Sequence, residues 1–119
     1  MDTTLSGHTI LVLEDEPLIA IDIVNSFQRA GAAVALARSV ADARKLVERS
    51  GISAAIVDFA LADGNADELC ERLNQKHVPF VLHSGYTHTG IACARGAVVP
   101  KPAGGDKLVE VVTQLLGRH

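Results

Sequence analysis

Five short apolar runs alternate along the chain with longer segments whose apolar residues recur at helical spacing. The runs cover residues 10–13, 33–37, 54–57, 79–82 and 97–99. Continuous apolar runs of this length are typical of parallel strands that are buried on both faces. The alternation predicts an α/β fold, in which helices cover both faces of a doubly wound, five-stranded parallel sheet.

Start and stop signals delimit the helical segments. Pro17 suits a first helical turn and Gly31 a stop, while Ser39 is a candidate N-cap for a helix that Gly51 closes. Asn65, followed three residues later by a glutamate, indicates the start of a third helix. The residues that we expect on the core faces of the helices are Ile19, Ile23, Phe27, Val40, Ala43, Leu46, Val47, Leu69, Leu73, Leu108, Val111, Val112, Leu115 and Leu116. Residues 88–96 lack such periodicity, so we expect a short or irregular helix there.

Length and composition indicate one small soluble domain. The 119 residues suffice for a single core, and we expect one domain over residues 1–119 with no output domain. A net charge of −3 and the lack of a basic stripe argue against nucleic-acid binding. No apolar run is long enough to span a membrane and the first residues lack a secretory signal, so we expect a cytoplasmic protein.

Charged and polar residues follow four of the predicted strands. Glu14 and Asp15 follow the first run, Asp58 the third, Ser84 the fourth and Lys101 the fifth. Open parallel sheets bind ligands in the crevice outside the carboxyl ends of their strands. We therefore expect these side chains to form one site.

The chemistry of this set favours a metal ion and a phosphoryl group. Three carboxylates in one crevice repel one another unless a cation is present, and Mg²⁺ accepts such oxygen ligands. Lys101 adds a positive charge suited to phosphate oxygens, and Ser84 adds a hydroxyl group. The simplest reaction for the set is phosphoryl transfer to a carboxylate, which gives an aspartyl-phosphate.

Each of these residues also has a purely structural explanation. Acids that follow a strand often cap the next helix or favour its dipole, Ser84 could belong to an ordinary turn, and Lys101 could lie in a surface loop. Four such coincidences in this order are what argue for a site. His83 borders the predicted pocket and is expected to be a strand-end residue without a chemical role.

The two cysteines, Cys70 and Cys93, are too few to indicate a disulfide framework, and they lack the spacing of metal ligands. Cys70 lies beside the apolar stripe of the third predicted helix. We therefore expect both cysteines to be packing residues and not redox sensors.

The chain resembles the receiver domain of two-component response regulators over residues 9–116. The matching motifs are Glu14-Asp15, Asp58, Ser84-Gly85 and Lys101-Pro102, each after its strand. The resemblance implies the flavodoxin-like strand order 2-1-3-4-5.

In that family the aspartate at the position of Asp58 accepts a phosphoryl group from a phosphohistidine. The resemblance implies that Asp15, Asp58 and the backbone carbonyl of Ala60 bind Mg²⁺ directly, with Glu14 acting through water. Lys101 would pair with the phosphoryl group and Ser84 would be the switch hydroxyl. It also implies a cis peptide bond between Lys101 and Pro102.

Three features depart from the family pattern. Val98 stands where most receivers carry an aromatic switch residue, and only 17 positions separate Ser84 from Lys101. The fourth strand reads PFVLHSGY, which resembles a motif of single-domain receivers in alphaproteobacteria that are associated with an atypical class of sensor histidine kinases. Tyr86 in this motif could partly replace the missing aromatic ring.

The resemblance implies a phosphoacceptor in two-component signal transduction, not an enzyme with turnover. Its partners would be a sensor histidine kinase or a histidine phosphotransfer protein, and a downstream protein target, with the chain as a monomer or weak homodimer. Two alternatives stay open: a degenerate receiver that binds its partner without phosphate, and an aspartyl-phosphate phosphatase. Such phosphatases usually carry a second aspartate two residues after the nucleophile, where this chain has Ala60.

Overall fold

The computed structural model describes residues 4–49, 51–58, 66–84, 93, 96–101 and 103–117. The described elements are β1 (Thr9–Leu13), α1 (Pro17–Arg29), β2 (Ala33–Ala37), α2 (Val40–Glu48), β3 (Ile52–Val57), α3 (Asp67–Gln75), β4 (Phe80–Ser84), β5 (Ala97–Pro100) and α4 (Gly105–Leu116). All neighbouring strands are parallel, in the order β2-β1-β3-β4-β5. This confirms the predicted sheet and its strand order.

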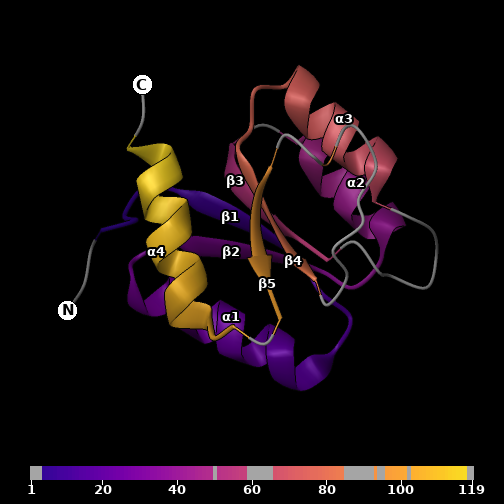
Figure 1. Ribbon diagram of the computed structural model, residues 1–119. Helices are drawn as coiled ribbons and strands as arrows, with labels where there is room; N and C mark the ends of the chain where they lie inside the picture. The colour runs from indigo at the N-terminus through magenta and orange to yellow at the C-terminus, as the bar shows by residue number, and fades with distance from the viewer. Residues whose placement is uncertain are drawn as a thin grey trace.

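Helices lie on both faces of the sheet, with α1 and α4 on one side and α2 and α3 on the other (Figure 1). Alternate residues of β1 divide between the two sides: Leu11 and Leu13 pack with α2 and α3, whereas Ile10 and Val12 pack with α1 and α4. All four are fully buried. Burial on both faces explains why the strands appear in the sequence as continuous apolar runs.

The helix signals are confirmed in part. The Ser39 hydroxyl accepts a hydrogen bond from the backbone N–H of Asp42 at 3.1 Å, as expected of an N-cap. Gly31 and Gly51 both have positive φ, which suits the stops predicted there. At α3 the N-cap is Ala66, which makes no side-chain capping bond, and Asn65 lies outside the described residues.

Most of the predicted helix-face residues are buried, but five of them are only half-buried: Ile19, Leu46, Val111, Leu115 and Leu116. Residues 88–92, 94 and 95, where a short or irregular helix was predicted, lie outside the described part of the chain. No helix among the described residues is long and apolar enough to cross a membrane.

Helix α4 approaches α1 closely at its first residue, just after the fifth strand. The backbone N–H of Gly105 donates a hydrogen bond to Asp22 Oδ2 at 2.8 Å. A Cβ atom on Gly105 would collide with the Ser26 side chain and the Asp22 carbonyl oxygen. Only glycine fits this contact, which holds the start of α4 against α1. Gly105 follows β5 within a few residues, so the contact also limits where the chain runs after the carboxyl end of β5.

Candidate functional site

Two buried carboxylates are held at the carboxyl ends of adjacent strands. Glu14 follows β1 and is 1% exposed, whereas Asp58 follows β3 and is 5% exposed. The backbone N–H of Asp58 donates to the carbonyl of Leu13 at 3.2 Å, and that of Glu14 donates to the carbonyl of Ala37 at 3.0 Å. The strand ladder therefore continues into the site and fixes both backbones.

Asp15 completes a group of three carboxylates. One oxygen each of Glu14, Asp15 and Asp58 lies within 4.8 Å of the others, and the Asp15 side chain is exposed. Two buried acids and one exposed acid therefore share the opening of the crevice. The structure brings together the three acidic side chains that the sequence predicts as a metal site.

Lys101 reaches this group from the end of β5. Its Nζ donates a hydrogen bond to Asp58 Oδ2 at 3.1 Å and lies 3.1 Å from Glu14 Oε1. Burial alone would lower the pKa of Lys101, but its hydrogen bonds to the two carboxylates outweigh this effect and raise the pKa. The ammonium group is therefore charged at neutral pH.

The charge of Glu14 is only partly compensated. Burial raises the pKa of Glu14 above its usual value, while hydrogen bonds from the Glu16 backbone N–H, at 3.1 Å, and from Lys101 oppose the increase. Three carboxyl groups face the single ammonium group of Lys101, so the acidic groups outnumber the described cation beside them. Mg²⁺ fits this set, because it binds through one or two carboxylates and keeps several waters.

His83 lies next to the site, on the side of the sheet that α1 covers. It is 2% exposed, and it lines a cavity of about 420 Å³ with Leu18, Ile19, Asp22, Lys101, Ala103 and Gly104. Burial lowers the pKa of His83, and the nearby Lys101 charge lowers it further. His83 is therefore held as a neutral group beside the lysine.

The remaining predicted site residues are described only in part. Ser84 ends β4 and pairs in register with Pro100, so its backbone lies at the same edge of the sheet as Asp58 and Lys101. Its side chain lies outside the described part of the structure, as do Ala60, Gly85, Tyr86 and Pro102. The predicted carbonyl ligand, switch hydroxyl and cis peptide bond remain predictions.

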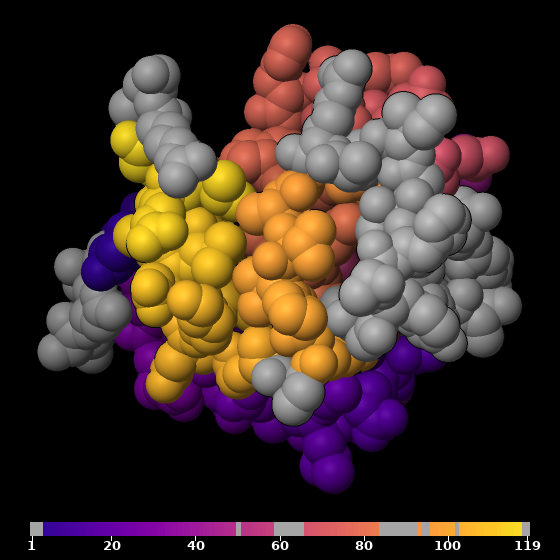
Figure 2. All heavy atoms as spheres, viewed as in Figure 1, coloured from indigo at the N-terminus to yellow at the C-terminus, as the bar shows by residue number. Residues whose placement is uncertain are grey.

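The position without an aromatic ring faces solvent. Val98 is 57% exposed, and it lies in β5, the edge strand of the described sheet. Figure 2 shows β5 at the surface beside α4.

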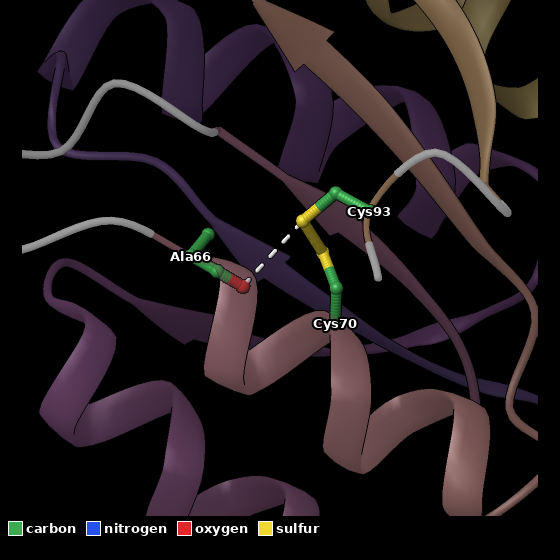
Figure 3. The surroundings of a disulfide bond; sticks show 3 residues. All are labelled: Ala66, Cys70 and Cys93. Carbon is green, nitrogen blue, oxygen red and sulfur yellow. Dashed lines mark hydrogen bonds between the residues drawn. A yellow bond between two sulfur atoms is a disulfide. The ribbon is translucent and has the colours of Figure 1, made fainter. Parts of the chain in front are cut away.

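The prediction that the two cysteines are packing residues is confirmed, but the bond between them was not predicted. They are fully buried in the core, but they are joined by a disulfide bond between α3 and Cys93, with a Cα–Cα distance of 5.0 Å (Figure 3). Twenty-three positions separate them, and the spacing of two cysteines in a sequence does not reveal whether the fold brings them together.

The fold and site define an α/β domain that gathers carboxylates and a lysine at the carboxyl ends of its strands. The model of the response regulator receiver domain matches residues 10–113, so the chain belongs to that family. This confirms the resemblance inferred from the motifs.

Solved structures agree with this assignment. A CheY-like receiver domain protein from Methanospirillum hungatei superposes with a TM-score of 0.84 at 21% identity, over 93% of this chain and 94% of that one. A putative response regulator from Chloroflexus aurantiacus gives a TM-score of 0.80 at 28% identity, over 93% and 98%. The response regulator TrrA from Thermotoga maritima, solved in complex with Mg²⁺ and BeF, gives 0.80 at 23% identity, over 91% and 98%.

A curated relative is much longer than this chain. The sensor kinase CckA of Brucella abortus is 27% identical over 127 residues, which cover 98% of this chain but 13% of that protein. The similarity is thus to a small part of a sensor kinase.

Proposed function

We propose that Asp58 is the phosphoacceptor of a two-component signalling pathway. The observation that carries this proposal is the contact of Lys101 with both Glu14 and Asp58, at 3.1 Å each, inside a pocket of three carboxylates. A lysine held there can pair with a phosphoryl oxygen once Asp58 is modified. Family membership over residues 10–113 supports the same role.

In the proposed reaction, a carboxylate oxygen of Asp58 attacks the phosphorus of a phosphohistidine. The new P–O bond forms as the P–N bond breaks, and the released imidazole takes up a proton. Bound Mg²⁺ would neutralise charge on the transferred group, with Asp15, Asp58 and the Ala60 carbonyl as ligands and Glu14 acting through water. Lys101 orients one phosphoryl oxygen, and the Ser84 hydroxyl donates a hydrogen bond to another.

The proposed donor is a sensor histidine kinase or a histidine phosphotransfer protein. The phosphorylated domain then acts either as a stand-alone relay, which transfers the phosphoryl group further, or as a switch that binds a downstream protein. We place this activity in the cytoplasm, with the chain as a monomer or weak homodimer. The alphaproteobacterial type of kinase suggested by the PFVLHSGY motif belongs to this finer proposal.

The surface of α1 suits such a donor. Leu18 and Ile21 are 77% and 56% exposed and lie three residues apart on one helix, and Leu18 also lines the cavity next to Lys101. Exposed apolar side chains that lie together can mark a protein-binding surface. An apolar partner surface seated here would lie beside the acceptor. The 3.6-residue helical period that buries Ile23 and Phe27 leaves Leu18 and Ile21 facing outward, so the sequence carried a signal for them.

A comparison of donors tests this docking surface. We expect Leu18→Ala/Ile21→Ala to slow transfer from a phosphorylated partner while leaving modification by acetyl phosphate unchanged. Leu36→Ala is the matched control. Leu36 is also a large exposed apolar residue, at 42%, but it lies on β2, at the edge of the sheet opposite to β5 and Lys101, and not on α1. Equal transfer rates for all three proteins would exclude α1 as the docking surface.

Intact-mass spectrometry after treatment with acetyl phosphate tests the acceptor itself. We expect a gain of one phosphoryl group that requires Mg²⁺ and is absent from Asp58→Asn. No gain, either from acetyl phosphate or from a phosphorylated kinase, would contradict the proposal and favour a phosphate-independent binding module. Repeated turnover of the donor with release of inorganic phosphate would favour a phosphatase.

A further inference from the structure

The disulfide joins two parts of the chain that lead to the candidate site. Cys70 is in the first turns of α3, and Cys93 precedes β5; both are fully buried in the core between the sheet and α3. Figure 3 shows the bond beside the start of α3, where the Sγ of Cys93 lies 3.6 Å from the carbonyl oxygen of Ala66. The bond therefore attaches the polypeptide before β5 to a helix on the face of the sheet.

Cys93 is coupled to the start of β5. The backbone N–H of Gly96 donates a hydrogen bond to the Cys93 carbonyl at 3.0 Å. Gly96 also lies tightly against the ring of Phe80, which a Cβ atom at that position would overlap. With Cys93 fixed to α3 and Gly96 fixed to β4, β5 begins at Ala97 from a defined position.

The other end of β5 positions Lys101. The strand has only four residues, lies at the edge of the sheet and pairs with β4 from Ala97 to Pro100. Lys101 follows directly and must reach two carboxylates at 3.1 Å each. Only these four residues lie between the anchored segment before β5 and Lys101.

We propose that Cys70–Cys93 is a reversible redox modification site, which exchanges with a dithiol and thereby sets how firmly β5 holds Lys101 at the site. The functional part of this inference rests on the proposed role of Asp58. Disulfides in reducing compartments, such as the cytoplasm that we propose here, are usually transient and catalytic or redox-sensing.

The exchange follows ordinary thiol chemistry. A thiolate of the dithiol attacks one sulfur of the Cys70–Cys93 bond, which forms a mixed disulfide and releases the other cysteine as a thiolate. The second thiolate of the reagent then attacks the reagent's own sulfur in the mixed disulfide and releases the remaining cysteine. The reagent is released as a disulfide. Its two electrons and two protons have been transferred to Cys70 and Cys93, which are now thiols. The reduced Cys93 thiol already faces an acceptor, because the Ala66 carbonyl is 3.6 Å from its sulfur. Since both cysteines are buried, exchange requires a local opening of this contact.

The test compares the oxidised protein with the same protein reduced by dithiothreitol. We expect reduction to speed amide hydrogen exchange across residues 96–101, and to slow Mg²⁺-dependent phosphorylation by acetyl phosphate at least about fivefold, the low end of typical coupling between sites. Cys70→Ser/Cys93→Ser is the matched control. It should behave like the reduced wild type and should not respond to dithiothreitol.

The outcomes separate this inference from the proposed function. Alkylation of both thiols in unreduced protein, or equal exchange and equal phosphorylation in the two redox forms, would overturn the redox site. Faster amide hydrogen exchange in the reduced form, without phosphorylation of either form by acetyl phosphate or by a phosphorylated kinase, would support the coupling to β5 while contradicting the role of Asp58. Unfolding on reduction, followed by circular dichroism, would make the bond a structural brace and overturn its regulatory role.

Discussion

The two ends of β5 are fixed by different chemistry. At its carboxyl end, Lys101 is held by charge, at 3.1 Å from both Glu14 and Asp58. At its amino end, the chain is held by a covalent bond from Cys93 to Cys70 in α3. The strand between them has four residues and is the edge strand of the sheet.

Because of this difference, the two ends of β5 respond to different chemical conditions. Ionic contacts respond to pH, to metal ions and to the charge of a phosphoryl group, because all of these change the electrostatic potential in the pocket. A disulfide is not broken by metal ions or by the charge of a phosphoryl group, whereas it is broken by thiols. If Asp58 accepts a phosphoryl group and Cys70–Cys93 exchanges with thiols, as we propose, this one short strand combines a phosphorylation signal with a redox signal.

Removal of the covalent anchor should have the largest effect on stability. The bond closes a loop of 23 positions, so Cys70→Ser/Cys93→Ser should lower the free energy of unfolding by about 3 kcal/mol. Urea unfolding of the oxidised wild type and the variant measures this loss. The same variant compared with reduced wild type should show almost no difference, and a large remaining difference would point to a packing defect at the serines.

Removal of the ionic anchor should cost less. Lys101→Met leaves Glu14 and Asp58 without their counter-charge, and we expect a loss of about 2 kcal/mol, less than for a fully buried pair because the lysine side chain is 23% exposed. Because burial raises the pKa of Glu14, this carboxyl is protonated at a higher pH than usual. The decrease in the free energy of unfolding caused by Lys101→Met should therefore become smaller as the pH falls through the acidic range, as measured by urea unfolding at several pH values. A decrease that does not depend on pH would contradict the electrostatic explanation.

Mg²⁺ bound by the carboxylates at the carboxyl ends of the strands should raise the free energy of unfolding, by less than Lys101→Met lowers it. When its free concentration is ten times the dissociation constant, an ion that binds only the folded state adds about 1.4 kcal/mol to the free energy of unfolding. Thermal unfolding with and without MgCl₂ measures this shift. Asp15→Asn should abolish it, whereas Asp42→Asn, which changes an acid on α2, should not. An equal shift in both variants would indicate a general salt effect.

His83 should make the smallest contribution, visible only in acid. Its folded-state pKa is lowered by burial and by the Lys101 charge, so below the ordinary histidine range the unfolded chain binds the extra proton first. The stability that the neutral ring provides is therefore present above that range and is lost as the pH falls through the lowered pKa, although Asp58 and Asp22 oppose the shift. His83→Gln should remove this part of the acid dependence in urea titrations at several pH values. An unchanged pH profile would exclude His83 as its source.

Much of the fold could be predicted from the sequence because the sheet is buried on both faces. A run such as 10–13 has no polar residue to interrupt it, and strand, helix and strand order then determine which carboxyl ends are adjacent. Glu14, Asp58 and Lys101 meet for that reason, and sequence order was sufficient to place them in one site.

Other contacts depend on three-dimensional packing and leave little trace in the sequence. The disulfide joins Cys70 of α3 to Cys93, 23 positions further along the chain, and no spacing rule for two cysteines expresses this approach. The contact of Gly105 with Asp22 similarly joins residues 83 positions apart. The disulfide that the sequence did not predict is thus a contact set by tertiary packing.

Reductive trapping of the modified residue tests the central claim most directly. An acyl phosphate on an aspartate is reduced by borohydride to homoserine, which tandem mass spectrometry locates in the sequence. After treatment with a phosphoryl donor and Mg²⁺, we expect homoserine at position 58 and at no other acidic position. Homoserine at position 15, 5-hydroxynorvaline (the product from a glutamyl phosphate) at position 14, or an intact aspartate at position 58 in protein that has gained a phosphoryl group, would contradict the assignment of Asp58 as the acceptor.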